Sequence, residues 1–292
     1  MRRTGPLLNC MLSLAALCLV RVAHTATGQS SVQPAVPASE LPCSAYVEGP
    51  PAAYTLDGIP WKETTITMEN HPGLLLVPDH ASSTEPLAWV WFAPMVHGQP
   101  NVNHAFILQH VLGSGMAFAS INVGESYGSA EGTRLYAEFH DLLTRCFNLS
   151  TKAVLFPQSR GGLMLFNWAA SHPDQVLRIA GIYPVCNLLS FPGLKVAAKA
   201  YDMTEEQLTS QLSEYNPLDL LASLAKADVP VLLMHGDIDK VVPTQDNSAE
   251  FVRRYQKLGG RATLLVVSGK GHQEADEFFK SQQFTTFLTT GK

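Results

Sequence analysis

The sequence predicts an α/β protein in which helices cover both faces of a mainly parallel sheet. Three observations support this prediction. After residue 93, short apolar strand patterns alternate with helical patterns to the end of the chain. An antiparallel hairpin is expected before this alternation begins. Near the middle, an apolar strand ends in a short turn around Ser159 and leads directly into an apolar helix.

The first 27 residues have the pattern of a secretory signal. Met1 is followed by two arginines, an apolar run covers residues 7–20, and small residues continue to Ala26. The apolar run is too short to span a bilayer comfortably. We therefore expect a leader over residues 1–27 that is cleaved, a secreted or periplasmic product, and no stable membrane association of that product.

The segment after the leader has the composition of a linker, and the net charge of the chain argues against nucleic acid as a partner. Residues 28–45 begin with a stretch rich in Gln, Ser, Pro, Ala and Val and are expected to form a linker. Loss of the leader would remove Arg2, Arg3 and Arg21 and no acidic residue, so the net charge would change from −5 to −8. An acidic chain without a basic cluster is a poor partner for nucleic acid.

Three cysteines would remain after removal of the leader, namely Cys43, Cys146 and Cys186. An odd number leaves at least one thiol unpaired unless two chains are linked, and the spacing does not say which two form a pair. Neither a Cys-x-x-Cys pair nor a His-x-x-x-His spacing is present in the chain. The sequence therefore gives no reason to expect a metal site, and we expect no cofactor.

Eight strands are expected, and the first two form a hairpin across a turn at residues 70–72. Residues 63–69 alternate and are β-branched, and the runs at 73–78 and 87–93 are apolar. The later strands are short apolar runs of the kind that a parallel sheet buries on both faces: 116–122, 153–156, 178–183, 230–235 and 262–267.

Helical patterns separate the later strands: 104–112, 132–147, 163–170, 248–258 and 275–288. One segment, 187–227, interrupts this alternation between the sixth and seventh strands. Within it, Thr204-Glu-Glu-Gln207 is a capping-box pattern that opens a short helix, and Asn216-Pro217 opens another. The segment is either a compact insertion or a long surface excursion.

The turn after strand 153–156 reads Pro157-Gln-Ser-Arg-Gly-Gly162. A serine at a sharp strand-to-helix turn, followed by glycines, has the features of a nucleophile elbow. The tight turn exposes the serine hydroxyl, and glycines let the helix pack close to the strand. The free N–H groups at the start of the helix could hold an oxyanion. The alternative is that Ser159 only caps the helix.

With this turn the chain resembles the α/β-hydrolase superfamily, whose elbow reads Gly-x-Ser-x-Gly. Pro157 stands in place of the first glycine and Gly161 keeps the second, so the packing beneath Ser159 must differ from the usual one. The resemblance covers almost everything after the linker, and it implies an eight-stranded α/β-hydrolase domain over residues 46–292. It also implies that the segment at about 187–227 is a small cap over the active site.

Two further segments resemble the superfamily more specifically. Residues 235–243 read His-Gly-Asp-Ile-Asp-Lys-Val-Val-Pro after the seventh strand, and residues 268–273 read Ser-Gly-Lys-Gly-His-Gln after the eighth. The superfamily order of serine, acid and histidine implies that Asp239 is the acid and His272 the base. Asp237 is the alternative acid, although the superfamily pattern His-Gly-x-x-Asp-x-x-Val-Pro places the acid two residues later, at Asp239.

The resemblance also implies an oxyanion hole built from two backbone N–H groups. Arg160 follows the serine and supplies one of them. Met95, in the loop after the third strand, is the expected source of the second, with Gln99 as the alternative. Tyr127 follows the fourth strand and is either a substrate-binding residue or a packing residue in a turn.

The side chain of Arg160 needs an explanation of its own. Ser159-Arg160 resembles the Ser-Arg pair in the elbow of glucuronoyl esterases, where the arginine helps to stabilise the oxyanion. This likeness predicts that Arg160 binds substrate and favours acidic sugar esters, because a guanidinium can hold a carboxylate with two hydrogen bonds. The alternative is an exposed arginine that has no role or pairs with an acid such as Glu125.

The function that the resemblance implies is that of a secreted serine hydrolase, in particular a carboxylesterase acting on small or carbohydrate-linked esters. It would work through an acyl-enzyme and without a cofactor. A peptidase like the catalytic domain of prolyl oligopeptidases ranks second, because that family carries an additional propeller domain. A binding protein without catalysis on the same fold is the third alternative.

Overall fold

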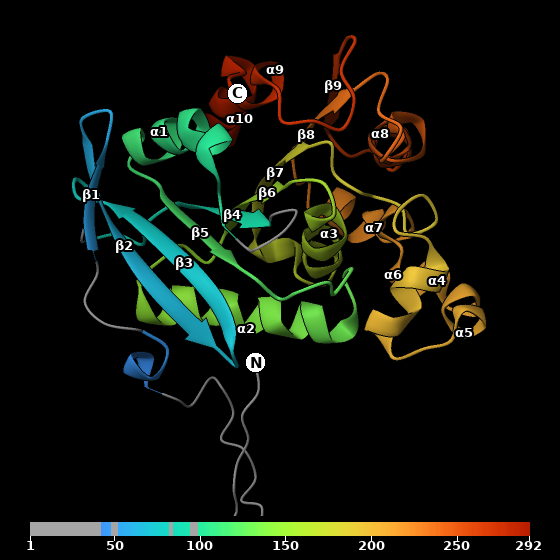
Figure 1. Cartoon of the computed structure of the whole chain (residues 1–292), viewed down its shortest axis with the longest axis horizontal. Coiled ribbons are helices and arrows are strands. Elements are labelled where there is room, and N and C mark those ends of the chain that lie inside the picture. Colours follow the sequence, from blue (N-terminus) through green and yellow to red (C-terminus); the bar gives the residue numbers. More distant parts are fainter. Residues whose placement is uncertain (1–41, 48–51, 82–83, 94–98) are drawn as a thin grey trace, which may run out of the picture. The chain divides into compact units, whose positions relative to one another are not determined.

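Strand pairing follows the expected pattern, with one strand more than the sequence predicts. The computed structural model describes residues 42–47, 52–81, 84–93 and 99–292, which belong to one unit of the chain. Within these ranges nine strands form a single sheet in the order β1-β2-β3-β5-β4-β6-β7-β8-β9 (Figure 1). The expected leader and most of the expected linker lie outside the described residues.

The first three strands are antiparallel: β1 (Ala52–Leu56), β2 (Ile59–Met68) and β3 (His71–Pro78). The predicted hairpin between β2 and β3 is present. Strand β1 was not predicted, and β2 begins earlier than expected. The available signal was Asp57-Gly58, a strong two-residue hairpin dipeptide, whose φ angles of 46° and 85° suit a tight turn.

The remaining six strands are parallel to one another: β4 (Trp89–Ala93), β5 (Ala117–Ile121), β6 (Ala153–Pro157), β7 (Val176–Ile182), β8 (Val231–Gly236) and β9 (Ala262–Val267). Their side chains alternate between two apolar cores. In β4, for example, Trp89 and Trp91 face one core, and Val90 and Phe92 face the other. Burial on both faces explains the continuous apolar runs of β4 to β8. Strand β9 lies at the edge of the sheet and differs from the expectation, because Ala262 is the only buried residue among its six.

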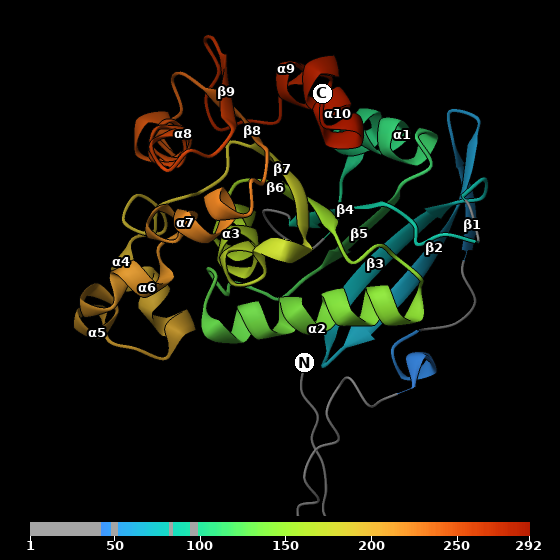
Figure 2. The same ribbon diagram turned by 180° about the vertical axis from the view of Figure 1, so that it is seen from behind.

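Helices cover both faces of the sheet (Figures 1 and 2). One layer holds α1 (Ala105–Gly113), α9 (Asp276–Phe279) and α10 (Gln282–Thr290), and the other holds α2 (Ala130–Cys146), α3 (Gly161–Ser171), α7 (Leu221–Lys226) and α8 (Ser248–Lys257). The predicted final helix is divided into α9 and α10, because the Ser281 hydroxyl caps a new helix by accepting the Phe284 N–H. The predicted fold class is confirmed, with nine strands instead of eight.

The segment 187–227 contains a series of short helices. It contains α4 (Leu194–Ala197), α5 (Glu205–Ser210), α6 (Leu212–Tyr215) and α7. Leu208 of α5 packs in a small core that includes Leu163 of α3. Leu221 and Leu224 of α7 instead pack in the larger core with α2 and α3. The structure therefore assigns the last part of the expected cap to the main helix layer.

Cys43 and Cys146 form a disulfide that ties the start of the described chain to the end of α2. Cys186 is free and buried. Burial raises the pKa of its thiol well above the usual value, so the thiol is unreactive near neutral pH. Of the three possible pairings that the sequence leaves open, the structure thus selects one.

We expect loss of this disulfide to destabilise the protein strongly. The two cysteines are 103 residues apart, and a crosslink that closes a loop of ~100 residues is worth about 4–5 kcal/mol through the entropy of the unfolded chain. The double variant Cys43→Ala/Cys146→Ala should unfold at a clearly lower denaturant concentration than the parent. Cys186→Ala is the control, and it loses only the packing of one sulfur. Equal midpoints for the parent and the double variant would contradict this expectation.

Candidate active site

Ser159 lies at the sharp turn between β6 and α3. Its φ of 51° is in the left-handed region, which is unfavourable for a residue with a side chain. Hydrogen bonds on both sides hold this backbone: the Ser159 N–H donates to the Ile182 carbonyl over 3.2 Å, and the Val185 N–H donates to the Ser159 carbonyl over 2.7 Å. The neighbouring strand β7 and the loop after it therefore keep the serine in a conformation that it would not adopt alone.

Two glycines after the serine let α3 approach the sheet. A Cβ atom at Gly161 would lie 2.1 Å from the carbonyl oxygen of Ala93, at the end of β4. A Cβ atom at Gly162 would lie 2.3 Å from the carbonyl oxygen of Val185. Both distances are far shorter than van der Waals contact, so neither position can carry a side chain without moving the backbone. The close packing expected from these glycines is present.

The packing around Pro157 explains how the elbow works without its first glycine. The proline ring lies against Gly181 of β7, where an added Cβ would be 3.2 Å from the ring Cγ. The regular pairing of β6 with β7 ends at Leu155 and resumes as an isolated bridge at Gln158. The missing N–H of the proline thus falls in a gap of the ladder, and a glycine in the neighbouring strand provides the space.

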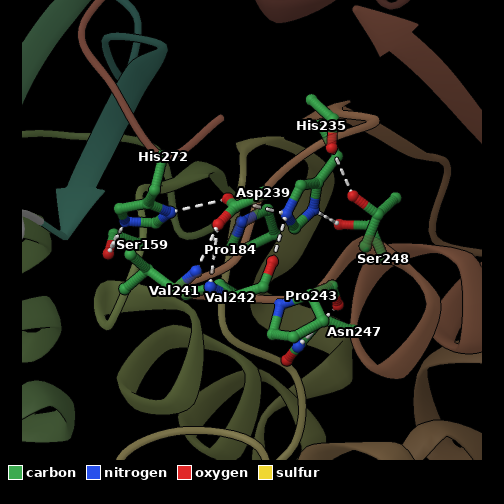
Figure 3. A network of polar contacts seen from close by, with 12 residues as sticks. Ser159, Pro184, His235, Asp239, Val241, Val242, Pro243, Asn247, Ser248 and His272 are labelled. Carbon is green, nitrogen blue, oxygen red and sulfur yellow. Dashed lines mark hydrogen bonds and ion pairs between the residues drawn. The ribbon is translucent and has the colours of Figure 1, made fainter. Parts of the chain in front are cut away.

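Ser159, His272 and Asp239 are joined by hydrogen bonds, although they come from distant parts of the chain (Figure 3). The Ser159 hydroxyl donates to Nε2 of His272 over 2.8 Å, and Nδ1–H of His272 donates to Oδ2 of Asp239 over 2.8 Å. A carboxylate can only accept, so the proton of the neutral imidazole is on Nδ1 and Nε2 can accept the serine proton. This is the arrangement that a nucleophile, a base and an acid require.

Both oxygens of the Asp239 carboxylate accept hydrogen bonds. Oδ1 accepts the backbone N–H groups of Val241 and Val242, each over 2.9 Å, and Oδ2 accepts from His235 as well as from His272. Burial alone raises the pKa of Asp239, but the hydrogen bonds from the two histidines and from the Val242 N–H outweigh burial and hold the pKa well below its usual value. Asp239 therefore stays charged at every pH at which a histidine can act as a base.

Asp237, the alternative acid, makes different contacts from Asp239. Its carboxylate accepts the backbone N–H of Gly269 over 2.7 Å and the hydroxyl of Ser268 over 3.2 Å. Gly269 has a φ of 70°, as the tight turn after β9 requires. Asp237 thus stabilises the start of the loop that carries His272. Within the described residues no hydrogen bond joins Asp237 to His272 itself.

Three polar residues that are not predicted as site residues are joined to His272 through successive contacts. The ring of Tyr183 packs against the His272 imidazole with 4.5 Å between ring centroids. The Gln158 amide donates to the Tyr183 hydroxyl over 3.1 Å and accepts from Nε2–H of His104 over 2.7 Å. The sequence suggests only a structural or solvated role for His104. His104 is buried beside Gln158, the residue before Ser159, and this contact depends on how the chain packs. Gln158 itself is part of the elbow motif and can be recognised in the sequence.

The backbone N–H of Arg160 is available for an oxyanion, because it makes no hydrogen bond to any residue that the structure describes. Met95, the expected second donor, lies outside the described residues. Gln99, the alternative, is described and exposed. The second donor therefore stays a prediction. Across the described ranges, no group of three His, Cys, Asp or Glu side chains could hold a metal ion.

The two residues expected to bind substrate both lie next to Glu125. The guanidinium of Arg160 pairs with the Glu125 carboxylate, which is the alternative that the sequence left open. Tyr127 is partly buried, and burial together with a hydrogen bond to Glu125 raises its pKa. The Tyr127 carbonyl accepts the hydroxyl of Tyr201 in the inserted segment over 2.8 Å. Glu125 thus competes with any substrate anion for Arg160.

A hydrogen-bonded serine, histidine and aspartate at the carboxyl edge of a sheet of this kind define a serine hydrolase of the α/β-hydrolase fold. Residues 138–289, more than half of the chain, match the prolyl oligopeptidase family. The chain belongs to this family. From the sequence alone, a peptidase of this family is the second-ranked function, because members of the family are expected to carry an additional propeller domain.

Individual relatives are distant. The acylamino-acid-releasing enzyme of Arabidopsis thaliana is 26% identical over 123 residues, which are 39% of this chain and only 16% of that relative. Among solved structures, an S-formylglutathione hydrolase from Agrobacterium tumefaciens superposes with a TM-score of 0.63 at 15% identity, covering 82% of this chain and 95% of the other. An acetyl xylan esterase from Paenibacillus sp. R4 gives 0.62 at 14% identity, covering 86% and 90%. The dipeptidyl peptidase 4 of Porphyromonas gingivalis gives 0.62 at 12% identity, covering 79% and 35%. At such identities these structures show the fold.

Proposed function

We propose that this protein is a secreted carboxylesterase that hydrolyses small or carbohydrate-linked esters through an acyl-enzyme. The observation that carries this proposal is the chain of hydrogen bonds from Ser159 through His272 to Asp239. As the Ser159 oxygen attacks the ester carbonyl, Nε2 of His272 takes the hydroxyl proton, and Asp239 stabilises the imidazolium. The amide of Arg160, together with the amide that we assign to Met95, holds the oxyanion.

The same groups complete acylation, the first half of the reaction, and then carry out deacylation, the second half. His272 returns its proton to the leaving alcohol, whose bond to the carbonyl carbon breaks as the acyl-enzyme forms. A water molecule then gives a proton to His272 and attacks the acyl carbon. The acid leaves, and the serine recovers its proton from the imidazolium. No cofactor is needed in either half.

The test of ester hydrolysis against peptide hydrolysis uses matched leaving groups. The protein is assayed with 4-nitrophenyl acetate and with acetyl-alanine and dipeptidyl 4-nitroanilides. We expect the ester to be hydrolysed faster than by the Ser159→Ala variant, and the anilides to react no faster than with that variant. Serine-dependent hydrolysis of an anilide would instead favour the peptidase alternative.

We also propose that residues 1–27 are a leader removed on export, which leaves a linker and a hydrolase domain over residues 46–292. The disulfide between Cys43 and Cys146 supports this, because disulfides form and persist in oxidising compartments. In the part of the chain that the structure describes, no helix combines the length and apolar character needed to cross a membrane. The mass of the exported protein should correspond to cleavage between residues 23 and 28.

We expect Arg160→Ala to affect neutral and acidic substrates equally. The guanidinium is already paired with Glu125, whose side chain is 47% exposed, so a substrate carboxylate would have to displace that pair. A partly exposed ion pair of this kind is worth ~0–1 kcal/mol, and the Arg160 side chain is itself 23% exposed, so we expect the loss of kcat/KM to stay below about fivefold. The measurement compares acetyl esters of glucose and of glucuronate.

Glu125→Gln is the matched variant for this comparison. It releases the Arg160 guanidinium without removing it, so the relative rate on the glucuronate ester should rise. If Arg160→Ala in the otherwise unchanged protein lost activity on the glucuronate ester alone, Arg160 would bind the substrate carboxylate in spite of Glu125.

A further inference from the structure

His235 lies fully buried behind Asp239, on the side away from His272 (Figure 3). It belongs to β8, and its ring lies between the Asp239 loop and the first residue of α8. Nε2 is 3.2 Å from Oδ2 of Asp239 and 2.8 Å from the carbonyl oxygen of Val242. Nδ1 is 2.8 Å from the hydroxyl oxygen of Ser248, which is also fully buried.

These neighbours determine where the proton of His235 lies. The Asp239 carboxylate and the Val242 carbonyl can only accept, so Nε2 must carry a proton and donate to both. In the neutral ring, Nδ1 then has no proton and accepts the hydroxyl of Ser248. Ser248 can also rotate its hydroxyl and accept, so the donor that faces Asp239 is the same in either charge state of the ring.

The position of His235 affects both oxygens of the carboxylate. It donates directly to Oδ2, the same oxygen that accepts from His272. Through the Val242 carbonyl it also holds the loop whose two N–H groups bind Oδ1. Rotation of the carboxylate would break bonds at both oxygens, so the direction in which Asp239 faces His272 depends on this ring.

We propose that His235, held by Ser248, is a positioning residue that orients Asp239 toward His272. This proposal rests on the proposed function, because it assumes that the three hydrogen-bonded residues carry out the hydrolysis. It assigns no contact with substrate to His235. Its effect must therefore appear in turnover and not in substrate binding.

The test compares two substitutions of nearly equal length. In His235→Gln the side-chain amide can place an N–H group near the position of Nε2, and its two protons suit the two acceptors. His235→Met fills a similar volume but has no donor. We expect kcat on 4-nitrophenyl acetate to fall by roughly 10- to 100-fold in His235→Met, the worth of a hydrogen bond to a charged group, with KM unchanged. His235→Gln should recover most of this loss.

A second measurement separates positioning from packing. The Nδ1 proton of His272 should give a downfield proton NMR signal in the parent, and it should shift in His235→Met but return toward the parent position in His235→Gln. Thermal unfolding is followed for both variants. Equal kcat values for parent and His235→Met would overturn the proposal. It would also be overturned if kcat fell equally in both variants and in proportion to their loss of thermal stability.

Ser248→Ala is a milder variant that removes a single hydroxyl and should fold. We expect a roughly three- to tenfold lower kcat with unchanged KM, because Nδ1 loses its partner and the ring is held less firmly. A parent-like kcat and an unmoved His272 signal in this variant would contradict the proposal. If instead the Ser159→Ala variant hydrolysed the ester as well as the parent, the proposed function itself would be wrong, so the two failures can be told apart.

Discussion

Replacement of Ser159 by alanine is expected to reduce kcat for a small acetate ester by on the order of 10⁴-fold or more. The variant loses the oxygen that attacks the carbonyl, while the Arg160 N–H and the binding surface remain. His272→Ala should cause a loss of the same order, and the double variant should lose little more, because the two side chains act as a unit. Steady-state hydrolysis of 4-nitrophenyl acetate measures all three.

Covalent labelling gives an independent readout of the same prediction. A fluorophosphonate probe should modify the parent at Ser159, and peptide mass spectrometry should locate the adduct. Ser268→Ala is the matched control, because Ser268 is an exposed serine on the loop that leads to His272. That variant should label like the parent, whereas Ser159→Ala should not label. An active Ser159→Ala protein would exclude the acyl-enzyme mechanism.

Asp239→Asn should be nearly as damaging, with a loss in kcat of roughly 10⁴-fold. In the structure both oxygens of Asp239 accept N–H groups, so an amide NH₂ in that place would face a donor. His272 would then be favoured in the tautomer with its proton on Nε2, which cannot accept the proton of Ser159. Fold and substrate binding should change much less than kcat.

Asp237→Asn is the control for this prediction. An asparagine oxygen can still accept the Gly269 N–H, and the Ser268 hydroxyl can rotate, so kcat should change by less than about tenfold. The two variants have the same change of charge two residues apart. If Asp237→Asn proved the more damaging change, Asp237 and not Asp239 would be the acid.

The strands and helices could be predicted because each depends on a local pattern. Apolar runs on strands buried on both faces, the capping box at Thr204 and the tight turn at Ser159 are all readable from neighbouring residues. Strand β1 also has a local signal, the hairpin dipeptide Asp57-Gly58 that joins it to β2. The division of the final helix at Ser281 is less visible, because nothing in the helical periodicity of residues 275–288 marks it.

The sequence by itself determined the fold class, and its resemblance to the α/β-hydrolase superfamily predicted the candidate serine, acid and histidine. Each of these follows a strand end in a fixed order, and parallel strands place their carboxyl ends along one edge of the sheet. The close packing of α3 at the glycines after Ser159 was likewise predicted, although the role of Gly181 in making room for Pro157 was not.

Only the tertiary structure decided which distant side chains meet. It pairs Cys43 with Cys146 and leaves Cys186 buried, and it turns Arg160 toward Glu125. It also places His235 and Ser248 behind Asp239. The physical reason is that such contacts depend on the path of the whole chain, which brings together residues whose separation in sequence carries no information about their distance. A strand end can be recognised locally, but the neighbours of its side chains exist only after the sheet and its helices have packed.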